Sequence, residues 1–244
     1  MRVETHSSMP ESVLTVQGVP IRLAQASGVW QPTPNGLFYA SFLEARPGER
    51  VIDIGAGSGV LAIWAALQGA AVFATDTDGP SVAAARASAS LNGVAITVAH
   101  DSLFGPWRQS YDAIFANLPN EWVPPAHIAT LSPTDAAQFV GGEGGNRLLI
   151  DLLEAAPLHM HAGSRLYLPV HSLTDYRSTL AKAKEHLDLE LLAERELPAK
   201  EFVSAYWEFY EPLVASGVIE VRRRSSSLFT VGYVYCARLK SPPR

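Results

Sequence analysis

A glycine-rich turn near residue 55 constrains the fold of this chain more than any other stretch of its sequence. The turn follows the apolar run 51–54, precedes the apolar run 60–68, and reads Asp53-Ile54-Gly55-Ala56-Gly57-Ser58-Gly59. A short apolar run that stops at glycines is typical of a buried parallel strand, and the longer apolar run after it predicts a buried helix. Glycines let the backbone turn tightly and approach a ligand closely, and the helix that follows offers free N–H groups. The turn therefore predicts a strand–loop–helix unit that binds a small ligand.

Further strand and helix patterns alternate after this turn. With 51–54, we expect strands at 71–75, 95–99, 111–116, 164–170, 187–193 and 228–237, and helices at 80–92 and 143–158. Strands that alternate with helices at this spacing indicate βαβ units, hence a mostly parallel sheet with helices on both faces. The chain is therefore predicted to be an α/β protein.

The segments outside this alternation complete a single predicted domain of residues 1–244. Residues 1–48 hold a hairpin over 12–24 with its turn at Gln17-Gly18, then a loop over 28–36 and a short helix over 37–45. Residues 49–195 form the ligand-binding core, 196–227 an insertion for substrate recognition, and 228–240 the last strand. The insertion carries apolar and aromatic residues at helical spacing.

The composition of the chain limits the classes of protein to which it can belong. Apolar residues make up 48% and charged residues 18%, which excludes a disordered chain, and the net charge of −5 argues against non-specific binding of nucleic acid. Cys236 is the only cysteine, so neither an internal disulfide nor a thiolate metal cluster is expected. No apolar run approaches the roughly 20 residues that span a bilayer, and residues 1–10 lack a secretory signal. We expect a cytoplasmic protein that does not enter a membrane.

Acidic residues at strand ends indicate which ligand the turn binds. A dinucleotide fingerprint needs a third glycine where this chain has Val60, and Asp53 would repel a pyrophosphate but suit an ammonium group. Asp76 ends the second strand, where a carboxylate can accept from both ribose hydroxyls, and Asp101 ends the third, where it can accept from an adenine amino group. The set predicts S-adenosylmethionine (SAM) and disfavours an NAD-dependent oxidoreductase. A second role for Asp53, holding the turn through backbone N–H bonds, stays open.

These runs resemble the class I SAM-dependent methyltransferases. The resemblance covers residues 50–117 and rests on 51–59, 74–78, 101–104 and 111–119. It implies a Rossmann-like seven-stranded sheet, mostly parallel with an antiparallel last strand, with SAM as cofactor and S-adenosylhomocysteine as product. The cofactor-binding residues that it implies are Asp53, Gly55, Gly57, Gly59, Asp76, Thr77, Asp101, Ser102 and Asn117.

The end of the fourth strand points to the reaction. Asn117-Leu118-Pro119-Asn120 resembles the Asn-Pro-Pro-Tyr motif of N-methyltransferases, and with 31–37 and 141–146 it points to the release-factor glutamine and ribosomal branch. The Asn117 side-chain oxygen and the Leu118 carbonyl would aim an acceptor nitrogen by accepting from its N–H groups, and Pro119 would stiffen the turn. Leu118 replaces the motif's first proline, and Asn120 replaces the aromatic residue that packs on a planar substrate.

Asn120 is itself a candidate for contact with the acceptor, and three further residues are candidates that each have an alternative role. Trp122 either restores an aromatic platform or packs in the protein, and Tyr206 lies either in a lid or in a helix packed on the sheet. Arg223, in the basic run 222–224, either meets an anionic substrate or lies in a solvated loop.

N-methylation of a small molecule or of a protein side chain is the favoured reading, with three alternatives. They are O-methylation with His100 or another histidine as base, methylation of rRNA or tRNA, and a non-catalytic regulatory role based on SAM binding. His100 can equally be a strand-end histidine without a role. No metal site is expected, because His159 and His161, two residues apart, do not share a helical face.

Overall fold

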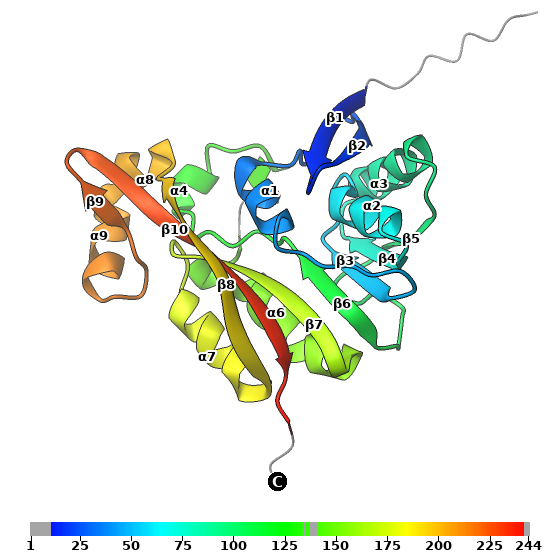
Figure 1. Ribbon diagram of the computed structural model, residues 1–244. Helices are drawn as coiled ribbons and strands as arrows, with labels where there is room; N and C mark the ends of the chain where they lie inside the picture. Colours follow the sequence, from blue (N-terminus) through cyan, green and yellow to red (C-terminus); the bar gives the residue numbers. More distant parts are fainter. Residues whose placement is uncertain (1–10, 134, 137–140, 242–244) are drawn as a thin grey trace, which may run out of the picture.

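A seven-stranded sheet forms the centre of the computed structural model, which describes residues 11–133, 135–136 and 141–241 (Figure 1). Its spatial order is β5 (Ile96–His100), β4 (Ala71–Asp76), β3 (Arg50–Ile54), β6 (Tyr111–Ala116), β7 (Met160–His171), β10 (Ser227–Leu239) and β8 (Leu187–Pro198). The first five of these run parallel to one another, whereas β10 is antiparallel to both β7 and β8. The Rossmann-like sheet with an antiparallel last strand is thus confirmed, with a short extra strand, β9 (Arg222–Arg224), on β10.

Helices cover both faces of this sheet, each with its own buried cluster. Residues of α1 (Pro34–Ala40), α2 (Val60–Leu67) and α3 (Gly79–Leu91) belong to one cluster, and residues of α6 (Arg147–Ala155) and α7 (Tyr176–His186) to the other. The run 60–65 of α2 is buried throughout, which explains why its sequence shows no polar face.

The N-terminal hairpin forms as predicted but joins α3 rather than the central sheet. Strands β1 (Glu11–Val16) and β2 (Val19–Ala24) pair through a turn in which Gln17 and Gly18 have φ of 49° and 79°, as the two-residue turns that match strand twist require. The Ala24 N–H donates to Ser88 Oγ of α3 at 3.0 Å.

Two predicted helices have different bounds. The helix expected at 37–45 begins at Pro34, because Thr33 caps it by accepting from the Gly36 N–H, and it ends at Ala40. The helix expected at 143–158 is divided into the turn η1 (Glu143–Gly145), α6 and the turn η2 (Ala156–His159). Gly144 has φ of 69°, which no helix residue adopts, so the glycine run forms a tight turn before α6.

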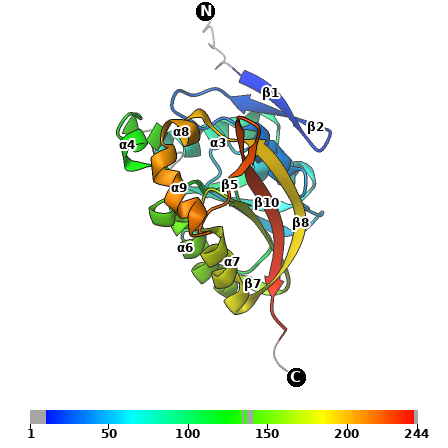
Figure 2. The ribbon, with the colours of Figure 1, turned by 90° about the vertical axis from the view of Figure 1, so that its left-hand side faces the viewer.

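The insertion 196–227 contains α8 (Glu201–Ala205), α9 (Trp207–Ala215) and β9, and has a small core of its own. Tyr210 is fully buried there, and its hydroxyl donates to the Trp122 carbonyl oxygen at 2.8 Å. Figure 2 shows α9 on the same side of the sheet as α6 and α7, and α4 (Pro125–Ile128), which was not predicted, beside α8. The basic run 222–224 is a strand rather than a loop, because its backbone pairs with residues 227–229 of β10. Arg222 and Arg224 also form ion pairs with glutamates of β8.

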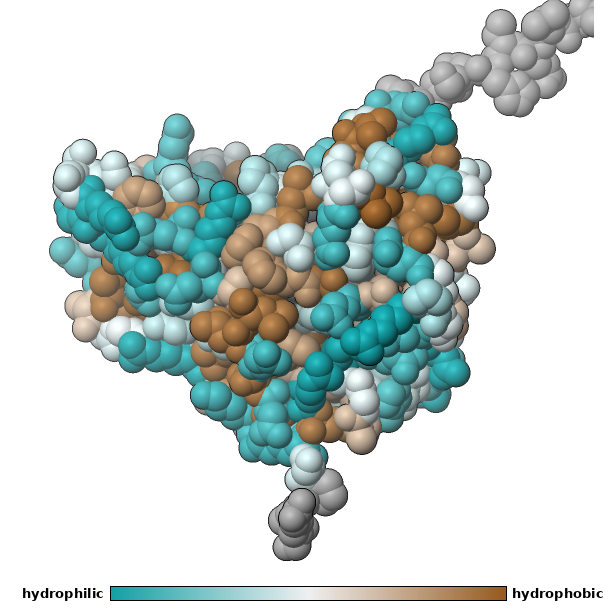
Figure 3. Space-filling view, viewed as in Figure 1, coloured by the Kyte–Doolittle hydropathy of each residue, from teal (hydrophilic) through white to brown (hydrophobic). Residues whose placement is uncertain are grey.

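No helix in the part of the chain that is described is long and apolar enough to cross a membrane. The expectation for residues 1–10 lies outside the described residues. Apolar side chains gather in the middle of the face shown in Figure 3, and edge strand β8 contributes Leu191, which is 48% exposed.

Candidate active site

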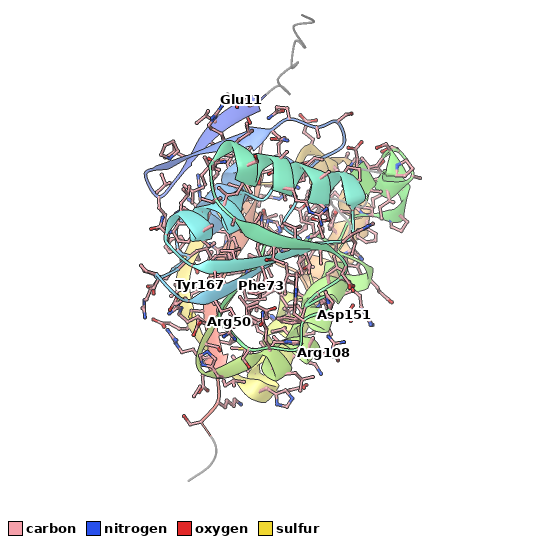
Figure 4. The ribbon with its side chains drawn as sticks, turned by 90° about the vertical axis from the view of Figure 1, so that its right-hand side faces the viewer. Glu11, Arg50, Phe73, Arg108, Asp151 and Tyr167 are labelled. Atoms are coloured by element: carbon pink, nitrogen blue, oxygen red, sulfur yellow. The ribbon has the colours of Figure 1, made fainter. Side chains whose placement is uncertain are left out.

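A large cavity lies across the carboxyl ends of the central strands, where open α/β sheets bind ligands. Its volume is about 1430 Å³, and its lining includes the glycine turn, the ends of β3, β4 and β5, the segment after β6, and α1. Pockets for one small ligand usually measure roughly 300–1,000 Å³. The cavity therefore has room for a cofactor and for part of a second molecule. Asp151 of α6, labelled in Figure 4, lines it from the second face of the sheet.

The glycines of the turn have different tasks. Gly55, Gly57 and Gly59 have φ of 72°, 54° and 84°, a region that favours glycine. Gly55 and Gly57 line the cavity, and a Cβ on Gly55 would lie 2.7 Å from Leu118 Cδ2. Gly59 is not among the lining residues, and a Cβ on it would lie 3.0 Å from the Ala85 Cα of α3. Its position supports close packing of α2 on α3 rather than the predicted cofactor contact.

Two carboxylates hold the turn in shape and also line the cavity. Asp53 Oδ2 accepts from the Ala62 N–H at 3.1 Å, so the loop-holding role left open for Asp53 is present. Asp76 accepts from the Gly57 N–H through Oδ2 at 2.8 Å and from the Asp78 N–H through Oδ1 at 2.9 Å. These bonds tie the glycine turn to the end of β4.

Burial makes the two carboxylates receptive to a cation. Desolvation, with a smaller contribution from the charge of Asp76, raises the pKa of Asp53 to about 7. The hydrogen bond from the Ala62 N–H opposes this rise. Desolvation also raises the pKa of Asp76, although the N–H groups of Asp78 and Gly57 lower it. A positively charged group bound beside these residues would favour their ionised forms.

The end of β5 forms the rim of the cavity. Thr77, Asp101 and Ser102 all line it, and Asp101 Oδ1 accepts from the Ser102 N–H at 2.8 Å while the side chain stays exposed. His100 is not among the lining residues, and its Nε2 lies 2.9 Å from the Thr77 carbonyl oxygen. The site thus includes the predicted acid at the third strand end, but its lining leaves out the predicted histidine.

Asn117 lies where β6 ends, against the first turn of α1. A Cβ on Gly36 of α1 would lie 3.0 Å from Asn117 Nδ2. Asn117 lines the cavity, and among the described residues its side chain has no hydrogen-bond partner. Both polar atoms of its amide group are therefore free to bind a ligand.

Tyr39, which the sequence did not single out, fixes α1 beside Asn117. Its buried hydroxyl accepts from the Ala116 N–H at 3.1 Å and donates to the carbonyl oxygen of Tyr167 at 2.9 Å (Tyr167 is labelled in Figure 4). Burial raises the pKa of Tyr39 well above its ordinary value, so the hydroxyl stays protonated. An aromatic residue in a short helix gives no sequence signal for such a bridge.

The rest of the predicted motif also lines the cavity. Leu118 covers Gly55, and Pro119 and Asn120 continue the wall. Asn120 Nδ2 donates to the Pro169 carbonyl oxygen of β7 at 3.2 Å. An amide anchored to the sheet therefore occupies the position of the motif's aromatic residue.

The three candidate acceptor residues do not reach the cavity lining. Trp122 packs edge-on against Phe209 with ring centroids 6.1 Å apart, and Tyr206 lies 5.6 Å from the ring of His127. The Arg223 guanidinium lies over the ring of Trp207 at 5.4 Å. Trp122 thus has the packing role that was its alternative, whereas Tyr206 lies between α8 and α9 and Arg223 lies in strand β9 rather than in a loop.

Other polar residues line the acceptor side of the cavity and were missed. Glu121, almost buried, pairs with Lys200 at 2.6 Å, and both contribute to the wall. His171 lies beside them, and burial lowers its pKa, so the ring is neutral. The one feature of the sequence that could have identified them is the position of Glu121, which directly follows the motif Asn117–Asn120.

The two histidines considered for a metal have other contacts. His159 stacks on Phe104 with ring centroids 3.9 Å apart, and His161 Nε2 lies 3.1 Å from Asp112 Oδ1. Within the described ranges, no group of three or more His, Cys, Asp or Glu side chains could hold a metal ion.

Comparisons with known proteins show which methyltransferases this chain is similar to. The family model for ribosomal protein L11 methyltransferase matches residues 37–123. A ribosomal RNA small subunit methyltransferase C of Chromohalobacter salexigens is 33% identical over 136 residues, which are 56% of this chain and 35% of that protein. A candidate protein N5-glutamine methyltransferase of Methanocaldococcus jannaschii is 24% identical over 193 residues, 78% of this chain and 96% of that one.

A solved structure supports the fold over nearly the whole chain. The 16S rRNA methyltransferase of Thermus thermophilus, in complex with AdoMet and guanosine, matches with a TM-score of 0.58 and 17% identity over 95% of this chain and 50% of its own. The present chain thus spans about a third of the Chromohalobacter relative and half of the Thermus enzyme. In its motifs, in the family model that it matches and in its fold, this chain is similar to the class I SAM-dependent methyltransferases, whose cofactor is SAM.

Proposed function

We propose that this chain transfers the methyl group of SAM to a nitrogen atom of a small molecule or a protein side chain. The observation that carries the proposal is the position of Asn117. Its amide group is free of hydrogen bonds among the described residues, lines the cavity, and is followed by Leu118, which covers the glycine turn. Amide oxygens at this point can aim an acceptor nitrogen at a methyl group held beside the turn.

The cavity residues suit the parts of SAM in chain order. Asp53, Gly55 and Gly57 would hold the amino-acid part, since burial makes the Asp53 carboxylate favour a neighbouring ammonium group. Asp76 and Thr77 would hold the ribose, and Asp101 and Ser102 the adenine. Because each oxygen of Asp76 accepts one backbone N–H, each keeps a lone pair for a ribose hydroxyl.

The chain's task in methyl transfer is alignment. SAM supplies an electrophilic methyl group on a positively charged sulfur. The acceptor nitrogen forms its new bond to that carbon as the carbon–sulfur bond breaks, the bonding pair stays on sulfur, and the nitrogen loses a proton. Asn117 Oδ1 and the Leu118 carbonyl would accept hydrogen bonds from the acceptor nitrogen, which orients its lone pair. S-adenosylhomocysteine is the second product.

The structure weighs against O-methylation with a histidine base. His100 is outside the cavity lining. Both ring nitrogens of His171 have protein partners, since Nδ1 lies 3.4 Å from the Leu173 N–H and Nε2 3.2 Å from Thr230 Oγ1. Relatives are named for glutamine and for rRNA as substrates, and the net charge of −5 favours the protein or small-molecule acceptor here.

We further propose that the chain acts as one domain in the cytoplasm, with part of the insertion facing the acceptor. Of residues 196–227, Leu197, Pro198 and Lys200 line the cavity. The helices α8 and α9 would support this wall from behind. A cytoplasmic location fits the single buried cysteine and the ribosomal names of the relatives.

The experiment that tests this function uses SAM labelled in its methyl group. The protein is incubated with labelled SAM and a cell extract separated into protein, RNA and small molecules, and labelled products are hydrolysed and identified. We expect label on a nitrogen in the protein or small-molecule fraction. Label on oxygen or in RNA would overturn the acceptor class, and SAM binding with no transfer to any fraction would support the regulatory alternative.

A further inference from the structure

Three residues form a row across the strands at one end of the cavity. In the register of the sheet, Gly232 of β10 lies opposite His171 of β7 and opposite Arg195 of β8. Residues directly opposite each other on neighbouring strands point to the same face of a sheet. All three line the cavity.

Gly232, in the middle of this row, has no side chain. It does not have a positive φ, so the backbone at this position does not require glycine. The nearest atom to a Cβ built on it would be Leu197 Cδ1 at 3.3 Å, the end of a flexible side chain. A glycine inside a strand without a backbone reason marks a place where another group approaches closely. The row therefore has no side chain of its own between His171 and Arg195, and the end of the Leu197 side chain lies beside this gap.

Arg195 brings an uncompensated positive charge to one end of the row. Its guanidinium lies 5.4 Å from the ring centre of Phe38, which also lines the cavity. Within the part of the chain that is described, Arg195 has no ion pair and no hydrogen bond from its side chain. Its neighbours Glu194 and Glu196 point to the opposite face, as alternation along a strand requires, and pair with Arg222.

The other charges near the row cancel each other. Glu121 and Lys200 form an ion pair at 2.6 Å, and His171 is neutral because burial lowers its pKa. The guanidinium of Arg195 is thus the net charge on this wall. A guanidinium offers paired N–H groups that match the two oxygens of a carboxylate or phosphate.

Helix α1 relates this charge to Asn117. Gly36 of α1 lies against Asn117, and Phe38, two residues later on the same helix, lies under Arg195. The point where the acceptor nitrogen would sit and the point where an anion would bind therefore both lie beside α1. The two points belong to one continuous cavity.

We propose that the row of His171, Gly232 and Arg195 binds the body of a small acceptor molecule, and that Arg195 binds an oxyanion on it, a carboxylate or a phosphate. The inference rests on the proposed function, because Asn117 defines the nitrogen end. A nucleic acid would meet several cations along its backbone, whereas this wall offers one in a chain of net charge −5.

Calorimetry on protein saturated with S-adenosylhomocysteine tests the inference. The probes are N-acetyl-L-glutamine, which has an amide nitrogen and a carboxylate, and its neutral analogue N-acetyl-L-glutaminamide. We expect the carboxylate probe to bind about tenfold more tightly, the scale of one charge-assisted bidentate contact at a partly exposed site. Competition by inorganic phosphate would identify a phosphate rather than a carboxylate as the preferred group.

Variants separate the role of Arg195 from general charge. Arg195→Gln should abolish the preference for the carboxylate probe. The matched control Arg238→Gln, on exposed Arg238 of β10 outside the cavity lining, should keep it. Gly232→Ala should weaken both probes, because its methyl group would occupy the gap between His171 and Arg195 and displace the end of the Leu197 side chain.

The inference is overturned by equal binding of the two probes, by no binding of either, or by a preference that survives in Arg195→Gln. RNA binding that depends on Arg195, with neither probe bound, would also overturn it and assign the row to nucleic acid. Titration of SAM into the native protein and the variants, each prepared without S-adenosylhomocysteine, distinguishes the two proposals. Intact SAM binding without the carboxylate preference refutes this inference alone, whereas loss of SAM binding refutes the proposed function as well.

Discussion

The buried carboxylate of Asp53 should make SAM binding depend on pH near neutrality. Burial raises the pKa of Asp53 from 3.8 to about 7, although the hydrogen bond that its carboxylate accepts from the Ala62 N–H opposes the rise. The ammonium group of SAM favours the ionised carboxylate, so binding should require Asp53 to lose its proton. Affinity should therefore rise with pH through about 7.

The size of the effect follows from the pKa. With a pKa of about 7, roughly one tenth of Asp53 is ionised at pH 6 and roughly nine tenths at pH 8, so ionisation of Asp53 alone would raise the association constant about tenfold over this range. The measured rise should be about fourfold, because an α-amino group loses its own proton near pH 7.7–8.0 and is roughly half deprotonated at pH 8. At pH 7, binding should release about half a proton from Asp53.

Stability of the ligand-free protein should change in the opposite direction. Because the folded-state pKa of Asp53 lies above its unfolded value of 3.8, the folded state binds the proton more tightly. The contribution of Asp53 to the free energy of unfolding is therefore greatest below about pH 4 and is lost as the pH rises through about 7. SAM should offset this loss most strongly at pH 8.

Calorimetric titration of SAM at pH 6, 7 and 8, in buffers with different ionisation enthalpies, measures both affinity and proton release. Asp53→Asn should weaken binding at pH 8 and remove most of the pH dependence. A native affinity that is constant from pH 6 to 8, or an unchanged rise in Asp53→Asn, would refute this account of Asp53.

Two further substitutions test how the site is supported. Tyr39→Phe should lower the free energy of unfolding by about 1–3 kcal/mol, because the Ala116 N–H and the Tyr167 carbonyl lose their hydroxyl partner. An unchanged midpoint of urea unfolding would show that these two hydrogen bonds do not stabilise the fold. Gly59→Ala should destabilise the fold more than Gly57→Ala, since its Cβ would lie 3.0 Å from Ala85 Cα, whereas the nearest atom for Gly57 is at 3.9 Å. In SAM titrations, Gly57→Ala should lose more SAM affinity than Gly59→Ala when each loss is compared with the variant's loss of stability. If Gly59→Ala lost more SAM affinity on this comparison, the separate tasks assigned to these glycines would be contradicted.

The sequence predicted those features that local pattern determines. Alternating apolar runs located all seven main strands, and Gln17-Gly18 located the hairpin, because each depends on residues close together in the chain. The strand-end acids were also found, since parallel strands bring their carboxyl ends to one edge. Asp53, Asp76 and Asp101 accordingly share one cavity.

The missed features depend on contacts between distant segments. Tyr39 bridges two strands through a hydroxyl whose partners are backbone atoms of residues 116 and 167, which no pattern around residue 39 reveals. Gly59 looked like its neighbours in the turn, yet the approach of α3 decides its task. Trp122 and Arg223 looked available for substrate, but Trp122 packs against Phe209 and Arg223 lies over Trp207, both aromatic residues of the insertion.

Methyl transfer by Asn117→Ala tests the central claim most directly. Transfer of labelled methyl from SAM to nitrogen acceptors is measured beside SAM binding, for the native protein and the variant. Loss of one positioning contact should lower turnover about a hundredfold, while SAM affinity changes by less than about threefold, because the variant removes the group that aims the acceptor. Unchanged turnover with intact SAM binding would contradict the assignment of Asn117 as the residue that aligns the acceptor nitrogen.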